Sequence, residues 1–203
     1  MYADAARDVM VDALAGVAGF LSLHTAFSPT GGSEVSGGSP AYARKAITWG
    51  PSVNGEAPSI TTSQVFDVPA GTTILFAGFW SLATAGTFYG MFPLTPTLVG
   101  QAEGESTDNK FYRRAHGFVN DDRVSFFGDN LPTGITEGTV YHVITSLTDS
   151  FEVSTTQGGS AVVITADGEA IAFKNIPEVF GGQGTYTVAI GDTKINLNFI
   201  SSS

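Results

Sequence analysis

At 203 residues the chain is long enough to bury one well-formed core or two small ones. Its formal net charge of −10 excludes the basic surface that binds nucleic-acid phosphates, and its lack of cysteine excludes disulfide scaffolds, thiolate metal sites and cysteine nucleophiles. The sequence holds no run of about 18 apolar residues, so we expect no membrane insertion.

The N-terminal segment 4–20 is the one stretch predicted as a helix. Its apolar residues recur at helical spacing, and its composition is rich in alanine. Asp4 is placed to cap the start, and the early aspartates suit the positive end of the helix dipole. A signal peptide has a basic start and an uncharged apolar centre, so Asp4, Asp8 and Asp12 argue against one. We therefore expect a protein that first folds in a cytoplasm.

Residues 21–99 alternate between strand-like runs and turns. The run 74–80 is nearly all apolar and predicts a central strand buried on both faces. Pro69 fixes the backbone of a turn at 68–71, and a glycine-rich loop spans 27–40. The other strands expected here are 21–25, 43–49, 59–66, 86–92 and 97–99.

A polar, acidic stretch at 101–109 is predicted as a linker into an insert. The insert, 110–176, has its own strand-like runs, which are separated by turn signals such as Gly158-Gly159. The strands expected within it are 123–127, 139–144, 151–154 and 170–174. After the insert the style of the first part returns, and it predicts a last hairpin of 184–190 with 194–200.

These patterns predict a mainly all-β fold: a β-sandwich with one N-terminal helix, plus an inserted small β-domain. The sandwich is expected to be discontinuous, built from residues 1–109 and 177–203. The β-module 110–176 lies between its two parts, and many short strands with glycine turns suit either a sandwich or a small barrel.

Three stretches near the N-terminus carry a resemblance to known proteins. They are 23–26 (Leu-His-Thr-Ala), 29–35 (Pro-Thr-Gly-Gly-Ser-Glu-Val) and 37–44 (Gly-Gly-Ser-Pro-Ala-Tyr-Ala-Arg). In this order they resemble a segment of tail-fibre and minor tail proteins of actinobacteriophages, and the stretches 68–72, 79–86 and 181–190 fit the same family. The chain departs from the family at Phe27-Ser28, where aspartate is usual.

A second resemblance lies in the insert. Its stretches 116–124, 131–141 and 149–154 are similar to a small β-module that is inserted or appended in many phage tail proteins. Together the two resemblances cover most of the chain. They imply a structural component of a virion, made in the cytoplasm of a host bacterium.

The three histidines, His24, His116 and His142, are the first candidates for metal ligands. A zinc site needs two or three of them to converge with a carboxylate, but their spacing is wide and His24 lies in a different predicted domain from the other two. We expect structural hydrogen bonds instead, with His24 and Thr25 satisfying backbone groups near a strand end.

Small groups of carboxylates raise the question of calcium binding or glycan hydrolysis. Asp121-Asp122, Glu103, Glu105 and Asp149 lack the tight alternating spacing of a calcium loop, and the two adjacent aspartates suit a turn. No feature brings a particular pair together, as a glycosidase requires, and no Gly-x-Ser-x-Gly elbow is present. We predict no catalytic, cofactor-binding or metal-binding residues and no enzyme activity.

Two features leave alternatives open. The aromatic residues that could line a sugar platform are Trp49, Trp80, Tyr42, Tyr89 and Phe92. Trp80 ends an apolar strand, which favours a core position, whereas Trp49 suits either role. The glycine-rich loop at 28–40 either docks on a neighbouring subunit or is an ordinary surface loop.

The resemblances and the lack of active-site signals lead to one hypothesis. We expect a non-enzymatic virion protein of a tailed bacteriophage, a minor tail or tail-fibre-like component. Its partners would be other virion proteins and further copies of itself, a trimer by analogy with fibres, with the helix at 4–20 as a docking element. Two alternatives stay open: a capsid decoration or head-fibre protein, and a module that recognises host cell-wall glycan through residues 110–176.

Overall fold

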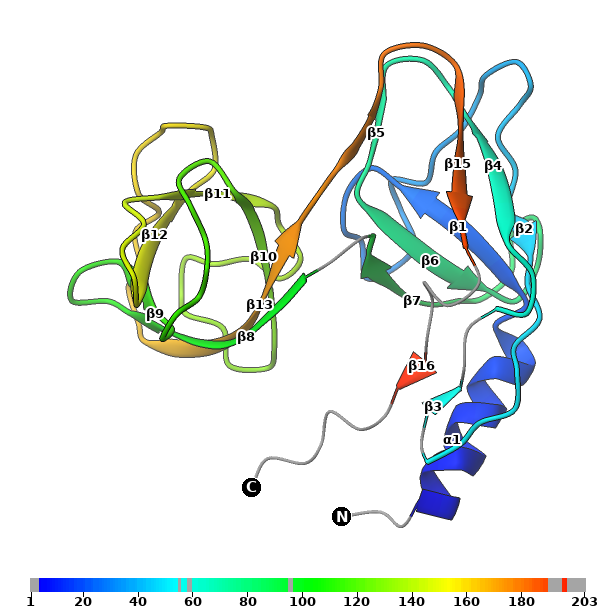
Figure 1. Ribbon diagram of the computed structural model, residues 1–203, viewed down its shortest axis with the longest axis horizontal. Coiled ribbons are helices and arrows are strands. Elements are labelled where there is room, and N and C mark those ends of the chain that lie inside the picture. Colours follow the sequence, from blue (N-terminus) through cyan, green and yellow to red (C-terminus); the bar gives the residue numbers. More distant parts are fainter. Residues whose placement is uncertain (1–3, 55, 58–59, 95–96, 190–194, 197–203) are drawn as a thin grey trace. The chain divides into compact units, whose positions relative to one another are not determined.

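The computed structural model describes residues 4–54, 56–57, 60–94, 97–189 and 195–196 (Figure 1). The chain divides into two compact units: Met1–Phe92 together with Glu178–Ser203, and Pro93–Pro177. Strands dominate both, and α1 (Asp4–Val17) is the one helix of the described chain. The predicted mainly all-β fold with one N-terminal helix is therefore confirmed.

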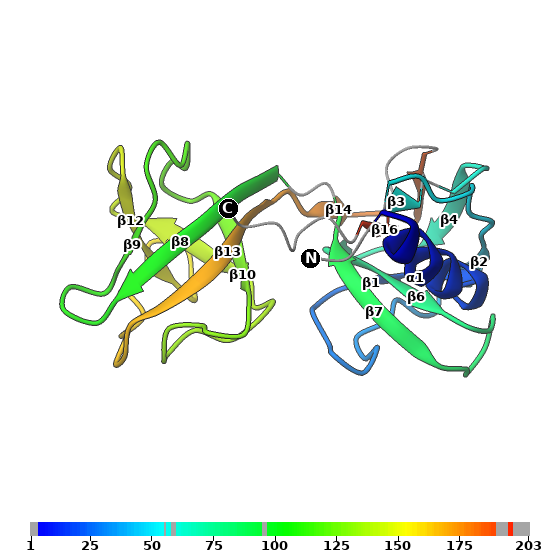
Figure 2. The ribbon, with the colours of Figure 1, turned by 90° about the horizontal axis from the view of Figure 1, so that it is seen from below.

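The first unit contains a four-stranded sheet in the order β2-β1-β6-β7. Its strands are β1 (Phe20–His24), β2 (Lys45–Ala46), β6 (Phe76–Trp80) and β7 (Phe88–Pro93). β6 is an interior strand, and all five of its residues are buried, as the apolar run predicts. β1 runs antiparallel to β6, with Phe20 opposite Trp80 and His24 opposite Phe76. Figure 2 shows β6 and β7 side by side.

The helix and the strands predicted at 43–49 and 59–66 are shorter than the sequence predicts, whereas β1 has the predicted length and begins one residue earlier. α1 ends at Val17 because the chain turns at Gly19 and Phe20 already belongs to β1. Between 43 and 49 only β2 is a strand, although Trp49 forms an isolated bridge with Ile60. The strand predicted at 59–66 corresponds to β4 (Gln64–Val68), and residue 59 lies outside the described part.

Three two-stranded ladders complete the described part of the first unit. β4 pairs with β15 (Gly184–Val188), β5 (Thr72–Ile74) with β14 (Glu178–Phe180), and β3 (Glu56–Ala57) with β16 (Ile195–Asn196). The predicted hairpin of 184–190 with 194–200 differs, because β15 and β16 each pair with an earlier strand. Its other residues, 190, 194 and 197–200, lie outside the described part.

The second unit is a closed six-stranded barrel in the order β10-β11-β12-β9-β8-β13. Its strands are β8 (Thr97–Glu105), β9 (Lys110–Tyr112), β10 (Arg123–Phe127), β11 (Tyr141–Ile144), β12 (Ser150–Ser154) and β13 (Gly168–Asn175). Neighbouring strands are antiparallel throughout. Closure leaves no free sheet edge for unwanted strand pairing.

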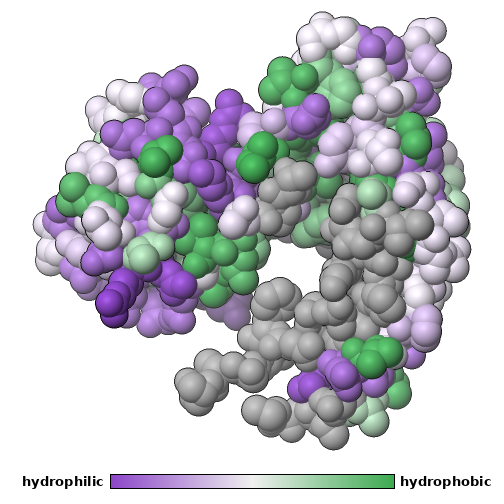
Figure 3. All heavy atoms as spheres, viewed as in Figure 1, coloured by the Kyte–Doolittle hydropathy of each residue, from purple (hydrophilic) through white to green (hydrophobic). Residues whose placement is uncertain are grey.

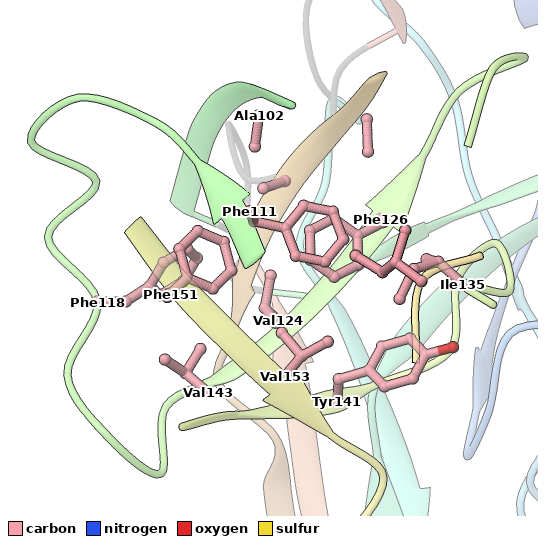
Figure 4. Close-up of a cluster of buried hydrophobic side chains, with 13 residues drawn as sticks. Ala102, Phe111, Phe118, Val124, Phe126, Ile135, Tyr141, Val143, Phe151 and Val153 are labelled. Carbon is pink, nitrogen blue, oxygen red and sulfur yellow. The ribbon is translucent and has the colours of Figure 1, made fainter. Parts of the chain in front are cut away.

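Aromatic rings from different strands fill the barrel interior (Figure 4). Phe111 stacks on Phe126 with ring centroids 4.2 Å apart, and Phe151 lies 5.5 Å from Phe111. All three side chains are fully buried. Burying one phenylalanine stabilises a fold by about 1.5–3 kcal/mol, so the second unit has a core of its own.

The strand predicted at 97–99 is the start of β8. The predicted linker at 101–109 is instead the rest of β8 and its turn into β9, so the second unit begins at Pro93 rather than at residue 110. Along β8, Gln101 and Glu103 are exposed while Ala102 and Gly104 are buried. Gly104 has no side chain because a Cβ there would collide with Pro132. Because its outward residues are polar and its inward residues are small, this part of the strand lacks the alternation of apolar and polar residues that predicts a strand.

Candidate functional site

Residues of the N-terminal resemblance converge on one cluster in the first unit. We call it the Arg44 cluster; its members are Ser22, His24, Glu34, Tyr42, Arg44 and Trp80. The guanidinium of Arg44 pairs with Glu34 through two bonds, Nε to Oε1 at 2.9 Å and Nη2 to Oε2 at 2.7 Å. It also lies 3.5 Å from the centroid of the Trp80 ring, and the Arg44 side chain is only 9% exposed.

Three segments of the chain position these groups. Trp80 ends β6, Glu34 forms an isolated bridge with His24 at the end of β1, and Arg44 immediately precedes β2. The turn after β6 supplies two acceptors, because Nη1 of Arg44 donates to the carbonyls of Leu82 (3.1 Å) and Ala85 (2.6 Å). The guanidinium fork thus joins a carboxylate, an aromatic face and a backbone turn.

Tyr42 links the ion pair to β1. Its hydroxyl donates to Oε1 of Glu34 at 3.3 Å and accepts from the backbone N of Leu23 at 2.8 Å. Desolvation raises the pKa of Tyr42 well above its usual range, so the hydroxyl stays neutral. Its ring stacks on Phe66 with centroids 6.1 Å apart.

His24 and Ser22 form the innermost part of the cluster. His24 Nδ1 donates to the carbonyl of Gly32 at 2.8 Å, so Nε2 is left to accept from the Ser22 hydroxyl at 2.7 Å. Trp80 Nε1 in turn donates to Ser22 Oγ at 3.0 Å. Burial lowers the pKa of His24, which favours this neutral ring. As the sequence predicts, His24 satisfies a backbone group near a strand end.

A serine in contact with a histidine raises the question of nucleophilic catalysis. Ser22 and His24 are both 0% exposed. Gly78 closes the space beside them, since a Cβ there would lie 2.7 Å from His24 Nε2 and 2.9 Å from Ser22 Oγ. No substrate carbonyl can reach the Ser22 hydroxyl without displacing β6. The arrangement holds residues 32–44 against β1 and β6, which is a structural task.

A shallow pocket of about 350 Å³ lies beside the cluster. Its lining residues include Glu34, Tyr42 and Arg44, together with the turn residues Ala83, Thr84 and Ala85. The polar groups of Glu34 and Arg44 that line it are already bonded to each other and to the backbone. The pocket therefore offers a ligand few free hydrogen-bonding groups.

The other two histidines lie on different parts of the barrel. His116 Nδ1 accepts from the backbone N of Phe118 at 3.0 Å, and its ring packs against Phe151 with centroids 4.9 Å apart. His142 is half-buried on β11. Within the described part of the chain, no group of three or more His, Cys, Asp or Glu side chains could hold a metal ion.

The candidate carboxylates Asp122 and Asp149 accept hydrogen bonds from other parts of the barrel. Asp122 Oδ2 accepts from Lys174 Nζ at 2.6 Å and from the backbone N of Val119 at 2.9 Å, and Asp121 takes a left-handed φ of 72°, as the predicted turn requires. Asp149 Oδ1 accepts from the backbone N of Ala115 at 2.9 Å.

Acidic side chains also gather on the outside of the barrel. Glu103 and Glu105 line a shallow pocket of about 310 Å³ together with Asn130, Asp167 and Glu169. Hydrogen bonds from the backbone N and the hydroxyl of Ser106 lower the pKa of the Asp167 carboxyl. The Asp167 side chain is therefore a charged hydrogen-bond acceptor at neutral pH.

The five aromatic residues of the proposed sugar platform do not form one exposed surface. Trp80 is buried under Arg44, and Tyr42 belongs to the same cluster. Trp49 donates its Nε1 to the carbonyl of Ala18 at 2.9 Å and packs edge-on against Phe79, which Phe92 also contacts at 5.1 Å. Of the five, Tyr89 alone is exposed, at 37%.

Sequence reasoning missed the Arg44–Glu34 pair as the centre of the cluster. The only signal that pointed to these residues was the resemblance, whose quoted stretches contain Glu34, Tyr42 and Arg44.

No family model, no curated protein and no solved structure matches the chain. In the described part, no helix is long and apolar enough to cross a membrane.

Proposed function

We propose that the chain is a non-enzymatic structural component of a tailed bacteriophage particle, a minor tail or tail-fibre-like protein that assembles through protein–protein contacts. The observation that carries this is the Arg44 cluster. In this cluster, residues from the stretches that resemble tail proteins hold loops against the sheet. The Ser22 and His24 side chains of the cluster are fully buried. A rigid framework of this kind suits a building block.

Localisation on intact particles tests the proposal. Immunogold labelling or cryo-electron microscopy gives the position, and quantitative mass spectrometry gives the copy number. A few copies at the tail support a tail protein. Hundreds of copies on the head would make it a capsid decoration or head-fibre protein instead, and absence from purified particles would contradict a virion role.

Recognition of host cell-wall glycan by the barrel is the second candidate function. The pocket lined by Glu103, Asn130 and Asp167 favours it, because carboxylate and amide groups can bond to sugar hydroxyls. This candidate is supported if the full chain binds host cell walls and Asn130→Ala weakens the binding. Substitution of the exposed Glu137 is the control and should leave the binding unchanged. Equal binding by both variants would count against it.

A further inference from the structure

The outer wall of the barrel carries a partly apolar pocket of about 260 Å³. Its apolar lining includes Phe127 on β10 and Ile171, which lies opposite Phe127 on β13. Phe173, two residues further along β13, packs edge-on against the Phe127 ring with centroids 5.7 Å apart. Figure 3 shows hydrophobic residues (green) gathered on the barrel in the region of β10 and β13, beside hydrophilic ones (purple). The pocket therefore offers a ligand an apolar surface that includes an aromatic ring.

The rim of this pocket is polar and continues into a second pocket. Asn130 and Glu169 line both this pocket and the one of about 310 Å³ that Glu103 also lines. Within the described part of the chain, the side chains of Glu103, Asp129 and Asn130 make no hydrogen bond. The two pockets form one groove, in which an elongated ligand meets amide and carboxylate groups along its length.

Two like charges face each other in this groove. Glu103 on β8 lies directly opposite Glu169 on β13, and both side chains are exposed. Like charges directly opposite on one face of a ladder destabilise it. The amide of Gln101 donates to Glu169 Oε2 at 2.6 Å, which holds this carboxylate without neutralising it. A cation bound between the two glutamates would relieve the repulsion.

The protein's own cations are engaged elsewhere. Among the described residues, no Lys, Arg or His lines either pocket. Lys110 lies opposite Glu105 but pairs with Asp108 at 3.0 Å. Arg113 Nη1 donates to the carbonyl of Gln101 at 3.4 Å. The positive charge that complements the groove therefore has to come from a ligand.

We propose that the groove binds a glycan that carries free amino groups, with a sugar ring against Phe127 and an ammonium group between Glu103 and Glu169. The C–H face of a sugar ring suits the aromatic lining, and its hydroxyls, which both donate and accept, suit the Asn130 amide. A peptide that binds as an added strand needs a free sheet edge, and the closed barrel has none.

This inference deepens the second candidate function, recognition of host cell-wall glycan, and rests on it. The two can still fail separately. Cell-wall binding that depends on Asn130 but not on sugar amines would contradict this inference alone. Binding of an amino sugar without binding to host cell walls would contradict the candidate function alone.

Isothermal titration calorimetry of the full chain tests the class of ligand. The two probes are a short β-linked oligomer of glucosamine and the same oligomer N-acetylated, which differ only at the amino groups. At about pH 5.5, where amines are protonated and most carboxylates are not, we expect the glucosamine oligomer to bind about tenfold tighter or more. Equal affinities overturn the proposal, and so does an oligolysine that binds as tightly, because the groove would then recognise charge alone.

Glu103→Gln tests the site, and it separates binding from folding. The substitution removes one of two facing charges, so the variant without ligand should unfold at a higher temperature than the parent chain. It should nevertheless bind the glucosamine oligomer about fivefold more weakly, because one partner of the ammonium group has lost its charge. Glu137→Gln, at an exposed barrel position, is the matched control and should bind like the parent. Equal binding by the two variants overturns the proposal.

Discussion

At the scale of single residues, Arg44 holds together parts of the chain that are far apart in sequence. Its planar fork bonds Glu34 at two points, while Nη1 reaches the carbonyls of Leu82 and Ala85 and the plane covers the Trp80 ring. A lysine ammonium has the same charge but neither the fork nor the flat face. The cluster therefore depends on the shape of the guanidinium as well as on its charge.

Arg44→Lys should lower the free energy of unfolding of the first unit by about 1–3 kcal/mol, because one ammonium cannot replace the paired bonds to Glu34, the two carbonyl bonds and the stacking on Trp80. Both tryptophans of the chain, Trp49 and Trp80, belong to this unit, so tryptophan fluorescence in urea reports on its unfolding alone. Arg114→Lys, at an exposed barrel position, serves as the control and should change nothing measurable. Equal effects of the two substitutions would show that the contacts of Arg44 contribute little.

Two glycines of the first unit should respond in opposite ways to alanine. A Cβ at Gly78 meets His24 Nε2 at 2.7 Å and Ser22 Oγ at 2.9 Å, so Gly78→Ala should destabilise the unit by about 2–4 kcal/mol through overpacking. A Cβ at Gly16 in α1 meets nothing within 4 Å, so Gly16→Ala should stabilise it by about 0.5–1 kcal/mol. Thermal unfolding of both variants measures the two changes in stability. A loss of stability in Gly16→Ala would contradict the open space at Gly16.

The buried neutral ring of His24 predicts a pH dependence. Burial lowers the pKa of His24 below its ordinary value of 6.5, so below pH 6.5 the unfolded chain binds this proton more readily than the folded one. The contribution to stability is fully present above pH 6.5 and is lost as the pH falls, by at most about 1.4 kcal/mol per pH unit.

Urea unfolding between about pH 7 and pH 5, above the range in which most carboxylates titrate, checks this dependence. The reference is His24→Gln, which cannot be protonated there. Its unfolding free energy should be lower overall but should change less with pH. Parallel slopes for the two proteins would rule out His24 as the source.

At the scale of elements, some strands were predictable and others were not, for physical reasons. β6 has five consecutive buried residues, and β10 and β12 combine strand-forming residues with nearby turn signals, so their existence follows from local pattern. The start of β8 was predicted at 97–99, but its continuation through 101–105 was not, because the inward positions Ala102 and Gly104 are small. The space there is filled by Pro132 from elsewhere in the barrel, which no local pattern reveals.

Closure and a separate core predict that the barrel folds alone. A fragment of residues 93–177 should unfold in one cooperative transition followed by circular dichroism, because its hydrophobic core lies wholly within that range. Phe126→Ala in the fragment should cost about 3–5 kcal/mol, while Val119→Ala, at a position that is 63% exposed, should cost little. A fragment without a cooperative transition would contradict the independence of the second unit.

At the scale of the whole molecule, the sequence predicts a β-domain interrupted by another but not the Arg44 cluster. Arg44 lies 10 residues from Glu34 and 41 from Ala85, and only the tertiary pairing of β1 with β6 brings these groups together. The buried state of Ser22 and His24 is equally non-local, since it depends on Gly78 of the neighbouring strand. Contacts of this kind follow from the packed fold and carry no local signal.

The register of β8 and β13 has a mechanical consequence. Thr97, at the start of β8, lies opposite Lys174 near the end of β13, so the chain enters and leaves the barrel through neighbouring ends of one antiparallel pair. Tension that reaches the barrel along the chain therefore pulls these two ends apart across the ladder. The hydrogen bonds between the two strands then break one after another, as in a zipper, rather than all at once in shear. Under load the barrel should yield at low force and lengthen the chain.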